Sequence, residues 1–391
     1  MSIEIVTRHL DAWMQMVPRT HAVGHLHEAG LQAVMFESVP CQGRATRVFA
    51  WIGMPEGATP DHPVPGMILI HGGGGTAFAR WVRIWNARGY AAIAMDTCGA
   101  IPLPDTGAPG PASWPRHSFS GPPGWGGFDQ CDRPPEDQWA FHAAAAIVKA
   151  HTLLAAQPGV DPGRIGATGI SWGGFLACLA AGLDPRLRCV MPVYGCGSIL
   201  ESPAWADTLA RNPDLLGFWR ETWDPAAWLP RARCPMLWLN GTNDFAFTPP
   251  IWQRSAASTG GPRQLCLKVR WPHGHMPAAE SARELFAFAD ACLLNGTPLI
   301  SLAPPVLADG VLSAAYGPER KLRAARLLAT PDSGGWPERE WFVLPAGTDP
   351  ERRMVSARLP DGATAACLSL VSEDWLTSTS DVVFPPSGAI Y

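Results

Sequence analysis

Short apolar runs of strand length alternate with helical segments through the middle of the chain, and this alternation constrains the fold more than any other feature. The run Met67–His71 is continuously apolar before its histidine, as expected of a strand that is buried on both faces. Because parallel strands need crossover connections, which are usually helices, the alternation predicts βαβ units and a mainly parallel sheet. The expected strands are 67–71, 90–96, 164–170, 189–194, 236–239 and 264–270, and the expected helices are 77–87, 136–156, 173–181, 250–257 and 281–294.

The two ends of the chain depart from this α/β pattern. The first thirty residues indicate a helix and a loop, and residues 34–54 alternate in the manner of a β-hairpin. After residue 296, short β-type segments are separated by turns, although residues 321–328 fit either a helix or a strand. We therefore expect an N-terminal helical segment over 1–32, an α/β domain over 33–296 and a small, β-rich, sandwich-like domain over 297–391.

Composition and charge exclude several classes of protein. Only 16% of the 391 residues are charged and the formal net charge is −4, so we expect neither nucleic acid nor an anionic membrane surface as a partner. No apolar run reaches the roughly 20 residues of a membrane helix, and the first residues do not resemble a secretory signal, so we expect a cytoplasmic protein. The ten cysteines form no CxxC pair, and His21, His25 and His27 lack a further ligand at metal-binding spacing. We therefore expect reduced thiols and no metal site.

A serine stands between glycines at the point where an expected strand runs into an expected helix. The segment Gly169-Ile170-Ser171-Trp172-Gly173 fits the G-x-S-x-G pattern of a nucleophile elbow. Such a tight turn lifts the serine hydroxyl above the carboxyl edge of the sheet, and side chains at the flanking glycines would collide with neighbouring backbone. The pattern predicts Ser171 as a nucleophile and the backbone amide of Trp172 as a donor to a developing oxyanion.

A glycine-rich loop, His71-Gly72-Gly73-Gly74-Gly75, follows another expected strand. Glycines allow the backbone to approach a substrate closely, and this pattern fits the loop that completes an oxyanion hole, with Gly73 and Gly74 as the expected donors. A phosphate-binding loop is the alternative, but the segment has neither the Gly-Lys-Ser/Thr ending nor the G-x-G-x-x-G spacing. We therefore expect no nucleotide and no other cofactor.

An acid and two candidate bases follow later strands, in the order Ser…Asp…His. Asp244 comes just after the expected strand 236–239, and the segment Trp271-Pro272-His273-Gly274-His275 comes after the next one. We expect His275 to be the base, because the preceding glycine gives its loop the freedom to bring the ring over Ser171. His273 is then a neighbouring hydrogen-bonding or substrate-contacting residue. Together these residues predict acyl transfer through a Ser-His-Asp triad.

The chain resembles the acetyl xylan esterase and dienelactone-hydrolase branch of the α/β-hydrolases, near the prolyl-oligopeptidase-type enzymes. The resemblance lies in HGGGGTAFARW, GWGGFDQCDRPPEDQW, GATGISWGGFLACLAAGLD, PVYGCG, MLWLNGTNDFAF and WPHGHMP, within residues 65–295. It implies an α/β-hydrolase fold for 33–296 and a serine esterase that removes short acyl groups, such as acetyl, from carbohydrates or other small alcohols. Dienelactone hydrolases use a cysteine nucleophile where this chain has Ser171, which favours the esterase interpretation.

Other residues leave room for further interpretations. Trp125, Trp139 and Trp205 are candidates for the wall of a substrate pocket, although most tryptophans serve in packing. An oligopeptidase or amidase would need acidic side chains near the serine, which Glu136 or Asp137 could supply. A non-catalytic protein with a hydrolase fold is a further alternative, and a homo-oligomer is compatible with the sequence.

Overall fold

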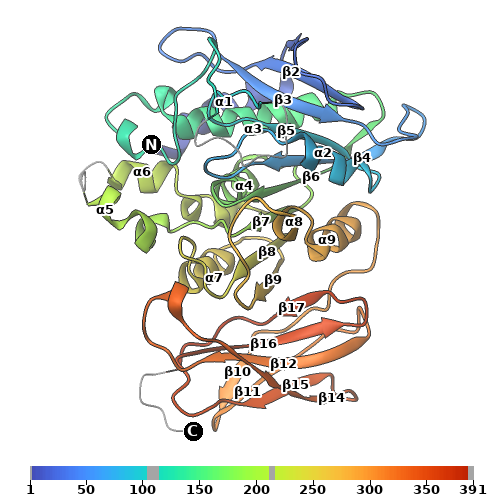
Figure 1. Ribbon diagram of the computed structural model, residues 1–391, viewed down its shortest axis with the longest axis vertical. Helices are drawn as coiled ribbons and strands as arrows, with labels where there is room; N and C mark the ends of the chain where they lie inside the picture. Colours follow the sequence, from blue (N-terminus) through green and yellow to red (C-terminus); the bar gives the residue numbers. More distant parts are fainter. Residues whose placement is uncertain (1, 104–113, 211–215, 386–391) are drawn as a thin grey trace.

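The computed structural model describes residues 2–103, 114–210 and 216–385, and Figure 1 shows one long sheet that runs through the molecule. Thirteen strands form it in the order β1-β2-β3-β5-β4-β6-β7-β8-β9-β17-β16-β12-β13. Its centre, from β5 through β4 and β6–β9, is parallel, as the alternation of strands and helices predicted. These strands are β4 (Val64–Ile70), β5 (Ala91–Met95), β6 (Val160–Ile170), β7 (Val190–Val193), β8 (Met236–Gly241) and β9 (Arg263–Lys268).

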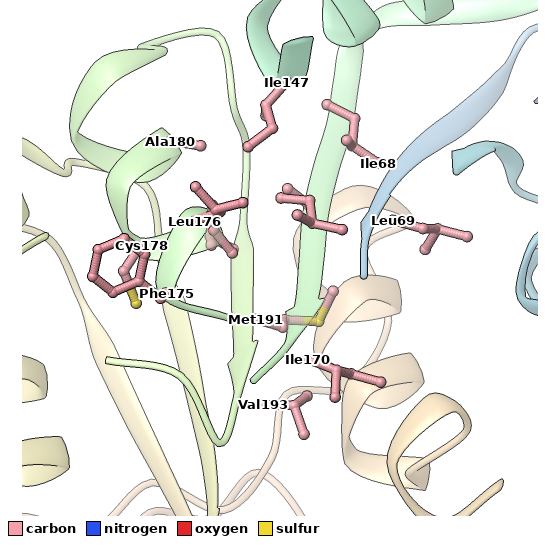
Figure 2. Close-up of a cluster of buried hydrophobic side chains, with 14 of the residues drawn as sticks. Ile68, Leu69, Ile147, Ile170, Phe175, Leu176, Cys178, Ala180, Met191 and Val193 are labelled. Atoms are coloured by element: carbon pink, nitrogen blue, oxygen red, sulfur yellow. The ribbon is translucent and has the colours of Figure 1, made fainter. Parts of the chain in front are cut away.

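Helices connect these strands and pack against them. Every residue of β5, β7 and β8 is buried, which requires cover on both faces of the sheet because successive side chains alternate between the faces. Figure 2 shows part of this core, where Ile147 of α3 and Leu176 of α4 lie beside Ile68 of β4. The helices are α2 (Ala79–Asn86), α3 (Trp139–Ala155), α4 (Trp172–Leu183), α7 (Pro249–Ala257), α8 (Pro277–Glu280) and α9 (Arg283–Leu293).

The N-terminal region joins the sheet instead of standing apart from it. Helix α1 (Ser2–Gln15) packs on α3, where the rings of Trp13 and Phe141 lie 5.1 Å apart. The expected hairpin is present as β2 (Leu31–Glu37) and β3 (Arg47–Gly53). Strand β1 (Thr20–Ala22) pairs with β2, so the interpretation of residues 1–32 as wholly helix and loop is wrong for this part.

Two irregular excursions lie between the central elements. The first, after β5, contains two short 3-10 helices, η1 (Phe128–Gln130) and η2 (Pro135–Asp137), and its residues 104–113 lie outside the described residues. The second, between β7 and β8, is built from short helices interrupted by the undescribed residues 211–215. Its elements are η3 (Ile199–Glu201), η4 (Pro203–Trp205), α5 (Ala206–Leu209), α6 (Leu216–Thr222), η6 (Pro225–Ala227) and η7 (Leu229–Arg231).

The C-terminal region is a sandwich that shares a sheet with the rest of the chain. β17 pairs with β9 at Thr379 and Leu265, so four C-terminal strands extend the central sheet, as seen in the lower half of Figure 1. A second sheet, β10-β11-β15-β14, packs on them around buried Leu312, Leu327 and Leu368. Of the ambiguous segment 321–328, residues 322–328 are part of a strand, β12. The elements are β10 (Val306–Ala308), β11 (Val311–Ala315), β12 (Leu322–Thr330), η8 (Trp336–Glu338), β13 (Phe342–Pro345), β14 (Gly347–Asp349), β15 (Met354–Arg358), β16 (Ala365–Ser372) and β17 (Thr377–Thr379).

Among the residues that the structure describes, every helix is too short or too polar to cross a lipid bilayer.

Candidate active site

Ser171 occupies a strained turn between β6 and α4. Its backbone has φ 58° and ψ −119°, a conformation that residues with a side chain rarely adopt. The flanking glycines are required by close backbone contacts: a Cβ on Gly169 would lie 2.0 Å from the carbonyl oxygen of Gly173, and one on Gly173 would lie 1.9 Å from that of Ile70. The expected nucleophile elbow is therefore present, with the serine at the carboxyl edge of the parallel sheet.

His273, and not His275, lies between Ser171 and the acid. Its Nε2 is 2.8 Å from Ser171 Oγ, and its Nδ1 is 2.6 Å from Asp244 Oδ2. A carboxylate accepts the Nδ1 proton, so Nε2 carries the lone pair that faces the serine hydroxyl. The expectation that His275 faces Ser171 is wrong, and His273, expected as a neighbouring contact, has that position.

Asp244 is fixed in the loop that follows β8. One carboxylate oxygen, Oδ1, accepts hydrogen bonds from the backbone N–H groups of Ala246 and Phe247, at 2.9 and 2.7 Å. The other oxygen is thereby directed at His273, and the side chain is almost completely buried. Asp244 thus stands where the sequence placed the acid.

Tyr194 lies under the imidazole of His273, a contact that the sequence analysis missed. The two rings stack with centroids 4.6 Å apart, and the Tyr194 hydroxyl donates to the carbonyl of Pro272 at 2.6 Å. Phe245 contacts another side of the same imidazole at 4.9 Å. Tyr194 directly follows β7, at the same sheet edge as Ser171, so its place at a strand end was the available signal.

His275 instead contacts the glycine-rich loop. Its Nε2 accepts a hydrogen bond from the backbone N–H of Gly72 at 2.8 Å, and its Nδ1 is 3.1 Å from Glu280 Oε1. Glu280 is buried and receives two hydrogen bonds from the Arg80 guanidinium, at 2.6 and 3.0 Å. The segment WPHGH therefore supplies two imidazoles, each paired with its own carboxylate.

The glycine-rich loop turns directly after β4 beside the elbow. Gly75 N–H donates to the carbonyl of Gly72, the indole N–H of Trp114 donates to that of Gly74, and Gly74 has a φ of 71°. Gly73 lies against Trp172, since a Cβ there would be 3.0 Å from the indole Cδ1. Trp172 is the first residue of α4, where the backbone N–H has no partner within the helix. The loop and this amide are thus neighbours, as an oxyanion hole requires.

His71 holds the same loop from its buried side. Thr97 N–H donates to His71 Nε2 at 2.9 Å, which leaves the ring proton on Nδ1, and Nδ1 donates to the carbonyl of Gly72 at 2.9 Å. Burial lowers the pKa of His71 below its ordinary value, because the charged imidazolium is poorly solvated there. The ring is therefore neutral at neutral pH, as this pattern of hydrogen bonds needs.

The expected pocket tryptophans divide into two groups. Trp205 packs on the Trp172 ring at 5.1 Å and Trp125 packs on His71 at 5.8 Å, so both lie beside the glycine-rich loop or the elbow. Trp139 is fully buried beneath Trp172 and donates to the carbonyl of Thr97, so the interpretation of Trp139 as a pocket wall is wrong. Its flat, bulky ring supports α4, the helix that follows Ser171, from inside the core.

The acidic residues considered for an amidase are held by N-terminal elements. Glu136 forms an ion pair with Arg8 of α1, and Asp137 accepts a hydrogen bond from the backbone N–H of Gln42 in the β2–β3 hairpin. These partners give no support for a subsite that binds the amino terminus of a peptide.

No cluster of three or more metal-ligating side chains occurs within residues 2–103, 114–210 and 216–385.

A cleft of about 610 Å³ borders the glycine-rich loop. Gly74 and His275 lie at the side of the cleft that is formed by the loop. The remaining wall combines aromatic rings with nitrogen donors, including Trp51, Phe78, Trp114, His27 and Arg80. Such a volume is typical of a pocket for a small molecule.

Comparisons with known proteins agree with this geometry. Residues 24–198 match the family model for acetyl xylan esterases. An acetyl xylan esterase from Paenibacillus sp. R4 has a similar structure, with a TM-score of 0.59, 20% sequence identity and coverage of 75% of this chain and 95% of that one. The chain has the α/β-hydrolase fold. The predicted resemblance to acetyl xylan esterases is confirmed.

Two further structures show how widely this fold is shared. Acetyl xylan esterase 1 from Thermoanaerobacterium sp. JW/SL YS485 gives a TM-score of 0.57 at 17% identity, covering 75% of this chain and 92% of that chain. The acylaminoacyl peptidase of Pyrococcus horikoshii gives 0.50 at 17% identity, covering 68% of this chain but only 42% of the peptidase. No curated protein matches the sequence significantly.

Proposed function

We propose that this hydrolase removes short acyl groups, acetyl above all, from carbohydrates or other small alcohols, with Ser171, His273 and Asp244 as its catalytic triad. The observation that carries the proposal is the continuous chain of hydrogen bonds from Asp244 through His273 to Ser171 Oγ. It links a buried carboxylate, an imidazole and a hydroxyl in the order that serine esterases use.

The first half of the reaction follows from this order. Ser171 Oγ attacks the ester carbonyl carbon while His273 Nε2 takes its proton. Asp244 keeps the imidazole in the required tautomer and stabilises the imidazolium that forms. His273 then returns the proton to the alcohol oxygen, the bond between the carbonyl carbon and that oxygen breaks, and the acyl group remains on Ser171.

Water completes the cycle by the same steps. His273 accepts a proton from water, which attacks the acyl carbon, and the proton then passes to Ser171 Oγ as the acid leaves. In both halves a negative charge develops on the carbonyl oxygen. The N–H groups of Trp172 and of Gly73 or Gly74 are the donors that we assign to it, and one such donor is typically worth about 3–4 kcal/mol.

A cleft beside the glycine-rich loop supports a small substrate, and its wall includes Gly74 and His275 but none of the three triad residues. The cleft beside the oxyanion loop offers aromatic faces and nitrogen donors, a combination that suits a hydroxyl-rich alcohol. Trp125 and Trp205 remain candidates for contact with the acyl group or the alcohol.

The ten free cysteines suit a reducing compartment, so we also propose a cytoplasmic location.

Hydrolysis of short-chain p-nitrophenyl esters tests the function, followed by a panel of acetylated sugars. The Ser171→Ala and His273→Ala variants should each lose more than about 10³-fold in kcat. Retention of wild-type turnover by either variant would refute the triad. Faster cleavage of aminoacyl amides than of acetyl esters would instead favour an amidase.

A further inference from the structure

The second imidazole of the WPHGH segment is buried in a position where it cannot act on Ser171. Only 12% of the His275 side chain is exposed, and the rings of Phe78 and Trp81 lie against it at 4.7 and 5.4 Å. Its Nε2 is occupied by the N–H of Gly72, a peptide group that cannot give up its proton. His275 therefore has a fixed acceptor atom directed at the loop that we assign to the oxyanion.

The tautomer of His275 is set by its two partners. Gly72 N–H donates to Nε2, so the ring proton is on Nδ1, from which it is donated to Glu280 Oε1. Glu280 is itself held by the Arg80 guanidinium, and its backbone carbonyl accepts from the indole N–H of Trp81 at 3.1 Å. Residues of α2 thus hold Glu280 of α8 in place, and the Glu280 carboxylate in turn holds the His275 imidazole.

Gly72 needs such external restraint because of its own chemistry. A Cβ at this position would lie 2.6 Å from the carbonyl oxygen of Ile170, so only glycine fits beside the elbow. Glycine is also the residue with the greatest backbone freedom. His275 holds the peptide before Gly72, while His71 and Gly75 hold the carbonyl of the peptide after it. That second peptide is planar and ends in the N–H of Gly73, so fixing its carbonyl also fixes the direction of the N–H.

We propose that His275, with Glu280, is a positioning residue for the oxyanion hole, which it serves by locking the peptide before Gly72 through Nε2 and so fixing where the peptide that carries the Gly73 N–H begins. This inference rests on the proposed function, because the Gly73 amide matters only if an oxyanion forms at Ser171. It assigns the two imidazoles different tasks: His273 moves a proton, whereas His275 moves none.

The charges around His275 agree with a neutral ring. Burial lowers its pKa, and the nearby His71 and Arg80 lower it further, while Glu280 acts in the opposite direction. These groups face the ring from α2, α8 and the glycine-rich loop. A neutral ring keeps Nε2 available as an acceptor at neutral pH.

Two substitutions of equal polarity and different reach test the proposal. In His275→Gln the side-chain oxygen can occupy the place of Nε2 and accept from Gly72, whereas in His275→Asn it ends near the place of Nδ1 and falls short. We expect His275→Asn to lower kcat for p-nitrophenyl acetate about 10- to 100-fold, less than the ~10²–10³-fold of a lost oxyanion donor. The KM should change less than twofold, and His275→Gln should recover most of kcat.

Binding of a boronic acid separates positioning from a general loss of stability. A boronate on Ser171 mimics the tetrahedral intermediate and places an oxygen in the oxyanion hole, so its affinity should fall in parallel with kcat in His275→Asn and recover in His275→Gln. His151→Ala is a matched control, since His151 is another buried imidazole with a carboxylate partner, Asp184 at 2.9 Å. It should lower the Tm without changing kcat or boronate affinity.

The outcomes distinguish this inference from the proposed function. Equal kcat and boronate affinity in the wild type, His275→Asn and His275→Gln would overturn the positioning role while Ser171→Ala remains inactive. Equal losses in the Asn and Gln variants would overturn it as well, because reach to Gly72 would then not matter. Full activity of Ser171→Ala would overturn the proposed function itself.

Discussion

The segment that follows β9 supplies two imidazole–carboxylate pairs, and they differ in what their Nε2 atoms contact. His273 with Asp244 faces a hydroxyl, which can lose a proton. His275 with Glu280 faces the N–H of Gly72, which cannot. The same chemical unit is therefore suited to proton transfer in one place and to rigid support in the other. Whether such an imidazole acts as a base or as a fixed support therefore depends on the partner of its Nε2, and not on the histidine or its carboxylate. We call His275 with Glu280 the anchor.

The supports of the two carboxylates differ as well. Asp244 is held by backbone amides of its own loop, and the preceding Asn243 donates to the carbonyls of Trp336, Pro337 and Arg339 in the C-terminal region. Glu280 is held by the guanidinium of Arg80 on α2. The loop of the proposed acid is thus bonded to the C-terminal region, whereas Glu280 is bonded to α2 in the α/β region.

The largest effect is expected from Asp244→Asn. An amide in this position can donate to His273 Nδ1 and leave the proton on Nε2, facing the serine, which is the wrong tautomer for a base. We expect kcat to fall about 10⁴-fold with little change in the fold. Steady-state kinetics with a circular-dichroism control checks this, and a loss below tenfold would contradict the assignment of Asp244.

His142 is a third buried imidazole to set beside these two, and its Nε2 lies 3.0 Å from a backbone carbonyl, that of Glu136. Burial lowers its pKa from 6.5 to about 4. The unfolded chain then binds a proton that the folded chain rejects, so stability should fall as the pH drops from about 6.5 to about 4, by up to about 3 kcal/mol.

His142→Gln keeps a donor toward Glu136 but cannot titrate. Urea unfolding at pH 7 and at pH 4.5 should therefore show a smaller loss of stability on acidification in this variant than in the wild type. An identical loss in both proteins would show that other groups cause it.

Glu280→Gln should have a moderate effect, the counterpart of Asp244→Asn on the anchor side. The glutamine amide can still accept from His275 Nδ1 but no longer matches the charge of Arg80. We expect kcat to fall about 3- to 10-fold, the equivalent of one weakened hydrogen bond of ~0.5–1.5 kcal/mol. A loss as large as that of Asp244→Asn, measured under the same conditions, would erase the distinction between base and anchor.

The smallest effect is expected from Asn243→Ala, which removes the contacts between the acid loop and the C-terminal region. Stability should fall by about 1–2 kcal/mol, and kcat should fall about twofold to threefold as Asp244 becomes less firmly placed. Gln253→Ala is the matched control, because Gln253 also bonds to the C-terminal region, at the carbonyl of Val382. It should lower stability similarly without affecting kcat.

The sandwich illustrates what sequence patterns miss. The short β segments separated by turns after residue 296 predicted a β-rich module correctly, but its union with the central sheet depends on one edge pairing, of β17 with β9. Strand pairing between distant segments leaves no periodic signal. Residues 322–328 of the ambiguous segment are a strand because neighbours on both sides, β16 and β13, supply hydrogen-bond partners.

The sequence by itself determined the order of strands and helices, the elbow at Ser171, the glycine-rich loop and the place of Asp244, because each depends on local periodicity or on the backbone freedom of glycine. Only the tertiary structure decided between His273 and His275. Both follow the same strand and have the same chemistry, so the choice depends on which carboxylate and which partner each ring meets. Asp244 comes from the β8 loop and Glu280 from α8, and folding brings each carboxylate to a different imidazole.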